Sequence, residues 1–84
     1  MSNWKKTREK LVLGASDANL DFEDVCTMLR HPGFSERPAK GSHRIFYRQA
    51  VEEIINLQPR GGKGKPYQMK QIRQILLACG LTGE

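Results

Sequence analysis

Cysteine is scarce in this chain of 84 residues, and long apolar runs are absent. Its two cysteines are too few for the disulfide framework that small secreted domains usually carry. No apolar stretch approaches the roughly 18 residues of a membrane-spanning helix, and the first residues are polar where a signal peptide would be apolar. We therefore expect one small cytoplasmic domain that makes no membrane contact.

Motifs for metal and nucleotide binding are also lacking. The four soft metal ligands have no C-x-x-C spacing and lie far apart in the sequence: Cys26, His31, His43 and Cys79. We therefore expect neither a metal site nor a cofactor. Both cysteines fall on apolar stripes, as buried thiols do, and His31 follows a helix end, where a cation is favourable. The basic segment 60–65 is followed by Pro66 and not by the Ser or Thr of a P-loop, which argues against nucleotide hydrolysis.

Acidic residues are scarce in the second part of the chain. Residues 1–36 hold five Lys/Arg against six Asp/Glu, whereas residues 37–84 hold nine against three. A basic surface suits a polyanion such as nucleic acid, although a solvated surface that only keeps the protein soluble has the same composition. Aromatic residues are only 7%, too few for a broad base-stacking platform, but Tyr47 and Tyr67 could each stack on a base.

Two helices are predicted in the first part of the chain. The first runs from Ser2 or Asn3 to Gly14, with a turn after it. The second begins after Asp21, a good N-cap, and ends before Pro32. Its apolar stripe has the spacing i, i+3, i+4, i+7 and consists of Phe22, Val25, Cys26 and Leu29.

Three extended segments follow, and a last helix ends the chain. The extended segments are residues 34–40, 43–48 and 53–58, and the connection 49–52 is short enough for a hairpin. Side-chain alternation makes Ile55 and Leu57 the expected core side of the third segment. Residues 59–66 form a glycine-rich basic loop. The last helix begins near Pro66, and its apolar stripe is Ile72, Ile75, Leu76 and Cys79, with Lys70, Arg73 and Gln74 facing water.

This order of elements predicts an α+β fold. Helices are expected to pack on one face of a three-stranded antiparallel sheet. Trp4 and Phe46 are expected in the core. Residues 1–19 form an N-terminal helix and turn, and residues 20–84 form the main domain.

His43 is the candidate for chemistry. A histidine titrates near neutral pH and can accept or donate a proton, and Gly41 and Ser42 before it allow close approach of a substrate and supply a hydroxyl. A lone histidine is more often structural. Here, however, cations that can hold phosphates lie nearby in the sequence: Lys40, Arg44, Arg48, Arg60, Lys63 and Lys65. Alternation along residues 43–48 does not decide which face is buried.

Residues 40–47, with the sequence Lys-Gly-Ser-His-Arg-Ile-Phe-Tyr, resemble the HicA family, the toxin half of a bacterial toxin–antitoxin pair. The similarity covers about residues 21–81, and its further matches are residues 56–59, 61–63, 71–76 and 80–81. Residues 1–19 lie outside the family pattern. The order of one helix, three strands and one helix is the family's, and it resembles the double-stranded-RNA-binding fold.

The resemblance implies a metal-independent endoribonuclease, an mRNA interferase that cleaves single-stranded mRNA and is neutralised by a cognate HicB-like antitoxin. The family's catalytic histidine corresponds to His43, and no second acid or base is assigned. The residues expected to bind the substrate are Lys40, Gly41, Ser42, Arg44, Arg60, Lys63 and Lys65. Two alternatives stay open: a non-catalytic RNA-binding module of the same fold, and a small protein-interaction domain whose charge serves only solubility.

Overall fold

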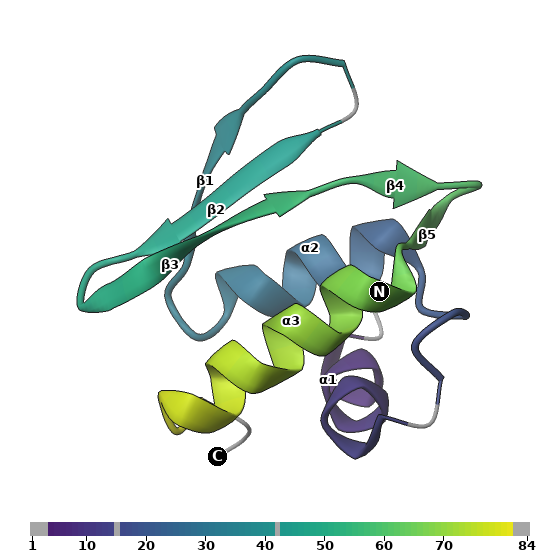
Figure 1. The fold of residues 1–84 in the computed structure, drawn as a ribbon, viewed down its shortest axis with the longest axis horizontal. Helices are drawn as coiled ribbons and strands as arrows, with labels where there is room; N and C mark the ends of the chain where they lie inside the picture. Colours follow the sequence, from purple (N-terminus) through teal and green to yellow (C-terminus); the bar gives the residue numbers. More distant parts are fainter. Residues whose placement is uncertain (1–3, 15, 42, 82–84) are drawn as a thin grey trace.

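Within residues 4–14, 16–41 and 43–81, which the computed structural model describes, the chain forms three helices and two small antiparallel sheets (Figure 1). The elements in chain order are α1 (Trp4–Leu13), α2 (Phe22–Arg30), β1 (Ser35–Pro38), β2 (Arg44–Arg48), β3 (Val51–Leu57), β4 (Pro59–Arg60), β5 (Lys63–Gly64) and α3 (Pro66–Ala78). Of the helices in these ranges, none has the length and apolar character needed to cross a membrane.

Helices α2 and α3 begin where the sequence predicts. Asp21 has extended backbone, and its carboxylate accepts a hydrogen bond from the Asp24 N–H (3.1 Å), so Asp21 caps α2. Pro66 is the first residue of α3, a position where its missing N–H leaves no intrahelical bond unmade. His31 is the C-cap residue of α2, which confirms its predicted place at the helix end.

The larger sheet has the predicted antiparallel arrangement, with the order β1-β2-β3. Only Gln49 and Ala50 connect β2 to β3, because Arg48 pairs with Val51. Strand β3 therefore begins two residues before the predicted position. Ala50 has φ 72°, in the left-handed region that L side chains rarely adopt, and this conformation closes the short connection.

The basic segment between β3 and α3 is a hairpin and not the open loop that was expected. Arg60 of β4 pairs with Lys63 of β5 across a two-residue turn. The turn residues Gly61 and Gly62 both have positive φ (59° and 78°), the conformation that a tight hairpin turn of this kind requires. Consecutive glycines between short extended segments are thus a hairpin signal here.

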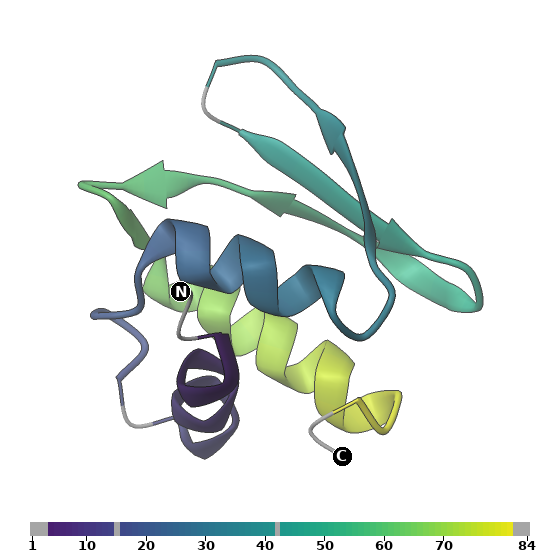
Figure 2. The same cartoon turned by 180° about the vertical axis from the view of Figure 1, so that it is seen from behind.

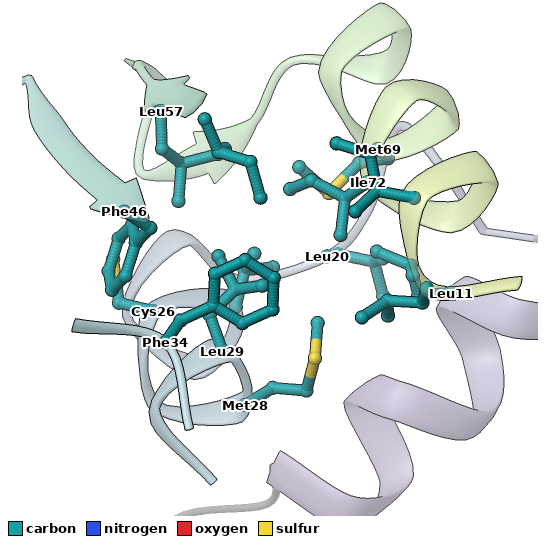
Figure 3. Packing of buried hydrophobic residues seen from close by; sticks show 14 of the residues in the cluster. Leu11, Leu20, Cys26, Met28, Leu29, Phe34, Phe46, Leu57, Met69 and Ile72 are labelled. Atoms are coloured by element: carbon teal, nitrogen blue, oxygen red, sulfur yellow. The ribbon is translucent and has the colours of Figure 1, made fainter. Parts of the chain in front are cut away.

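The core lies between the larger sheet and helices α2 and α3 and continues between these helices and α1. Helices α2 and α3 cover one face of that sheet, and α1 packs on their far side (Figures 1 and 2). Wholly buried side chains from every layer meet there (Figure 3): Leu11 of α1, Val25, Cys26, Met28 and Leu29 of α2, Phe46, Ile55 and Leu57 of the sheet, and Met69, Ile72 and Leu76 of α3. This arrangement confirms the predicted α+β class, the helices on one face, and the core side of β3.

Gln68 connects α3 to the sheet. Its buried side-chain amide accepts a hydrogen bond from the Gln58 N–H (2.9 Å) and donates one to the Asn56 carbonyl. A side-chain amide has the same donor and acceptor as a peptide group. Gln68 therefore satisfies two backbone groups at the end of β3 and fixes the start of α3 beside them.

Three side chains lie elsewhere than expected. Cys79, assigned to the apolar stripe of the last helix, is exposed because α3 ends at Ala78. Arg73, expected to face water, is only 17% exposed at its side chain and bonds to Asp17. Trp4, expected in the core, is partly buried and packs against its edge.

Candidate active site

Strand pairing brings two of the segments singled out in the sequence to the same end of the molecule. Arg44 at the start of β2 pairs with Leu57 at the end of β3. The connection that precedes β2 and the β4–β5 hairpin that follows β3 therefore lie at one end of the sheet (Figure 1). The start of α2 joins them, because the Phe22 N–H donates to the Gly62 carbonyl (3.0 Å) and the Gly64 N–H donates to the Leu20 carbonyl (3.0 Å).

An open cleft of about 810 Å³ lies where these segments meet. Its lining residues are Phe22, Glu23, Glu36, Pro38, Ala39, Gly41, His43, Arg44, Pro59 and Gly62. His43, directly before β2, is partly exposed, so a ligand in the cleft can reach the residue. A turn holds it there: the His43 N–H donates to the Lys40 carbonyl (3.2 Å), and Gly41 adopts a left-handed conformation (φ 64°).

The predicted site residues divide into two groups. Gly41, His43 and Arg44 line the cleft, and Lys40 is exposed beside it in the same turn. The other three do not line the cleft. Arg60 and Lys63 are exposed on the β4–β5 hairpin, and Lys65 lies at the start of α3. Lys65 donates to the Gln58 side chain (2.8 Å). Ser42 lies outside the described residues.

Two carboxylates hold the Arg44 guanidinium in place. Glu23 accepts a bond from Nη2 of Arg44 at 2.9 Å, and a carboxylate oxygen of Glu36 lies 3.6 Å from Nη1. Glu36 also accepts bonds from Arg30 (3.0 Å to Nε and 2.6 Å to Nη2). Besides His43, the cleft lining thus contains two carboxylates and one guanidinium, and a second guanidinium, that of Arg30, is bonded to Glu36.

Sequence reasoning did not assign Glu23 or Glu36 to the site. Glu23 has an ordinary explanation as an acidic residue in the first turn of a helix, where it faces the positive end of the helix dipole. Glu36 lies in the edge strand β1, which carried no motif. Glu23, Glu36 and Arg44 lie on three different elements, so no pattern of neighbouring residues in the sequence indicates that they meet.

The second histidine lies away from the cleft. The His31 ring stacks on Trp4, with 3.7 Å between ring centroids and 10° between the ring planes. The cleft is at the start of α2 and His31 follows its end. Among the residues that the structure describes, no group of three or more His, Cys, Asp and Glu side chains is placed to hold a metal ion.

Comparisons with known proteins leave the family open. No protein-family model, no curated protein and no solved structure matches this chain. The function is therefore argued from the residues of the cleft and its surroundings.

Proposed function

We propose that this chain is an endoribonuclease that cleaves single-stranded mRNA without a metal ion, as the HicA-like toxin of a type II toxin–antitoxin system. The observation that carries the proposal is the position of His43, which is partly exposed and lines an open cleft. Residues from two of the segments that resemble the HicA pattern, 40–47 and 61–63, line this same cleft. Their meeting supports the interpretation of both segments as parts of one site.

A more specific fold accompanies this proposal. The proposed fold is that of double-stranded-RNA-binding domains, built from α2, the three strands of the larger sheet and α3, with α1 added before them and the β4–β5 hairpin inserted before α3. A fold by itself does not imply an activity. The proposal therefore depends on His43 and its surroundings and not on the architecture.

The proposed reaction uses the nucleophile that RNA itself supplies. Neutral His43 accepts the proton of a ribose 2′-hydroxyl, and the freed oxygen attacks the adjacent phosphorus. The bond between phosphorus and the 5′-oxygen breaks, the leaving oxygen takes a proton from water, and a 2′,3′-cyclic phosphate remains. A positioned acid–base group typically accelerates such a step by about 10²–10⁴-fold.

Cations beside the cleft are assigned to the RNA backbone. Lys40, Arg60 and Lys63 are exposed and adjoin residues that line the cleft. Phosphate contacts from Lys and Arg supply most of the affinity of proteins for nucleic acids, and that affinity weakens steeply with salt. Arg44, held by two carboxylates, is assigned to the cleft wall and to the charge that develops on the phosphoryl oxygens.

The experiment that tests this function measures cleavage of a single-stranded RNA by the purified chain in the presence of a chelator. We expect cleavage by the wild-type chain and by His31→Ala, the matched control for loss of a histidine away from the cleft. His43→Ala should bind the RNA but cut it at least about 100-fold more slowly. Cleavage of a substrate with 2′-deoxyribose at every position would reject the mechanism.

A toxin in the cytoplasm also needs a partner that masks it. We propose a HicB-like antitoxin that covers the cleft. Expression of the wild-type chain alone should arrest growth, whereas co-expression with a HicB-like antitoxin should restore it. Harmless expression of the wild-type chain together with purification free of any partner would contradict this part of the proposal.

The second candidate is a non-catalytic RNA-binding module. It is favoured by the two carboxylates of the cleft lining, which disfavour a scissile phosphate beside His43, whereas the cations outside the cleft can still hold RNA. The same assay separates the two functions. Salt-sensitive RNA binding with equal and negligible cleavage by the wild-type chain and His43→Ala would support the module.

A further inference from the structure

Tyr67 is the most exposed aromatic side chain among the described residues. It lies in the first turn of α3 and is 64% exposed, whereas Tyr47 is 42% exposed and the phenylalanines are buried. The Lys65 ammonium lies 6.0 Å from the centre of the Tyr67 ring. The residue therefore keeps most of its surface exposed, and a planar group could stack on the ring opposite the Lys65 ammonium.

Four cations lie close to this ring in the chain. We define the Tyr67 patch as Arg60, Lys63, Lys65, Tyr67 and Lys70. Residues 54–83 contain no Asp or Glu, and the carboxylate of Asp21, which forms a β-bridge opposite Lys63, is bonded to the Asp24 N–H at the start of α2. None of the four cations forms an ion pair with any residue described, whereas Arg30, Arg44 and Arg73 are each paired with a carboxylate.

The helix α3 and the β4–β5 hairpin carry the members of the patch. Lys70 follows Tyr67 by three residues on α3, so the two side chains share a helix face. Lys65 donates to Gln58, which connects the start of α3 to the chain just before β4. Figures 1 and 2 both show β5 directly beside the start of α3.

We propose that the Tyr67 patch binds an unpaired segment of RNA, with a base stacked on Tyr67 and phosphates held by the flanking cations. This inference rests on the proposed function for the choice of RNA as the ligand. A basic surface that carries an exposed aromatic ring is how proteins bind single strands, because every base has a face that can stack. A duplex keeps its bases stacked on one another, so it offers no base to the ring.

The patch is continuous with the cleft. Pro59 and Gly62 of the β4–β5 hairpin line the cleft, and Arg60 and Lys63 of the same hairpin belong to the patch. A strand bound on Tyr67 can therefore extend along the hairpin to His43. The patch holds the substrate on one side of the scissile bond and selects single strands.

The test measures binding of a fluorescent 12-nucleotide oligouridine in a His43→Ala background, so that cleavage does not interfere. Tyr67→Ala should weaken binding at least about fivefold, the range found when a stacking ring is removed, and Tyr67→Phe should restore it. Tyr47→Ala is the matched control, because that tyrosine also lies near a cation (Arg37, 5.8 Å) but shares its hairpin with Glu52 and Glu53. The Tyr47→Ala variant should bind the oligouridine as tightly as the chain that keeps Tyr47.

Two further measurements separate stacking from charge. Lys70→Gln should lower the slope of log affinity against log salt by about 0.7, the value for one lost phosphate contact to a single strand. A 12-base-pair RNA duplex should bind more weakly than the single strand. Unchanged binding by Tyr67→Ala, an equal loss in Tyr47→Ala, or tighter binding of the duplex would overturn the inference.

Failure of the patch and failure of the nuclease give different results. Without any cleavage by the wild-type chain, a Tyr67-dependent affinity still supports the patch while the nuclease proposal fails. If His43-dependent cleavage occurs, Tyr67→Ala should raise KM with little change in kcat, because stacking away from the reacting atoms stabilises substrate and transition state alike. Cleavage with an unchanged KM would leave the nuclease intact and reject the patch.

Discussion

At the scale of single residues, the two cysteines differ in chemistry because they differ in burial. Cys26 lies in the core on α2 and has no exposed surface, whereas Cys79 is exposed at the end of α3. Burial disfavours the thiolate and raises the pKa of the Cys26 thiol from its usual value near 9.0 to about 11, an effect that nearby Arg44 partly opposes. Only Cys79 is therefore accessible to a thiol reagent in the folded protein.

The raised pKa of Cys26 makes stability depend on pH in the alkaline range. Between about pH 9 and pH 11 the unfolded chain loses the thiol proton while the folded protein keeps it, so the free energy of unfolding falls as the pH rises. The loss amounts to about 1.4 kcal/mol per pKa unit. Below pH 9 both states keep the proton and the contribution is constant.

Urea unfolding at pH 8 and pH 10.5 checks this prediction. Wild type and Cys26→Ala should differ in how much stability they lose between the two pH values, with the larger loss in wild type. Cys79→Ala controls for removal of a thiol that is exposed, and it should behave as wild type does. An equal alkaline loss in wild type and Cys26→Ala would contradict a raised pKa at Cys26.

At the scale of elements, one side chain joins the first helix to the last. Nη1 of Arg73 on α3 donates to the Leu11 carbonyl (3.0 Å) near the end of α1 and to Asp17 Oδ1 (2.9 Å), and Nη2 donates to Asp17 Oδ2 (3.1 Å). The hydrogen bonds to Asp17 raise the pKa of Arg73 above its ordinary value. The paired bonds to Asp17 and the bond to the Leu11 carbonyl hold the turn after α1 against α3.

Loss of that contact should destabilise the fold. Arg73→Ala leaves the carboxylate of Asp17, which is only 23% exposed at its side chain, without its partner. We expect a loss of about 1–3 kcal/mol in the free energy of unfolding. Arg73→Lys should recover only part of it, because an ammonium cannot make the paired bonds. Lys70→Ala, an exposed cation on the same helix, should change stability by less than about 0.5 kcal/mol.

Urea unfolding at neutral pH measures these differences. Equal stabilities of Arg73→Ala and Lys70→Ala would show that the contact to α1 contributes nothing.

Local patterns account for what the sequence could predict. The stripe on α2, the Asp21 cap and the alternation in β3 each depend on neighbours within a few residues, and each matches the structure. Arg73 and Asp17 are 56 residues apart, and Arg44 and Glu23 are 21 apart. No periodicity encodes such pairs, because they follow from how elements pack.

The same reasoning explains the mixed result at the candidate site. His43 drew attention through a local string of residues, and it lines the cleft. The carboxylates beside it come from the start of α2 and from an edge strand, so only the packed fold brings them to Arg44. Cys79 was misplaced because helical spacing continues past the residue where a helix ends.

At the scale of the whole molecule, paired and unpaired cations occupy different places. Arg30 and Arg44 are neutralised where α2 meets the sheet, whereas Lys40, Arg60 and Lys63 beside the cleft have no carboxylate partner in the described part of the chain. The unpaired charge that attracts a polyanion therefore lies beside the cleft, while the two carboxylates of the lining are paired with Arg30 and Arg44. RNA binding should then reflect a competition between the two.

Removal of one carboxylate from the cleft lining should shift this competition. Glu23 is 64% exposed at its side chain, so Glu23→Gln should cost no more than about 1 kcal/mol of stability. The variant should bind a 12-nucleotide RNA about threefold more tightly at low salt, the effect of one unit charge several ångströms from a phosphate in water. The gain should shrink at higher ionic strength, because screening weakens the repulsion that Glu23 exerts in wild type.

Glu52→Gln, at the opposite end of β3, removes the same charge far from the cleft and should leave the affinity unchanged. Equal gains in both variants would mean that net charge alone governs binding, and no gain in Glu23→Gln would place the RNA outside the cleft.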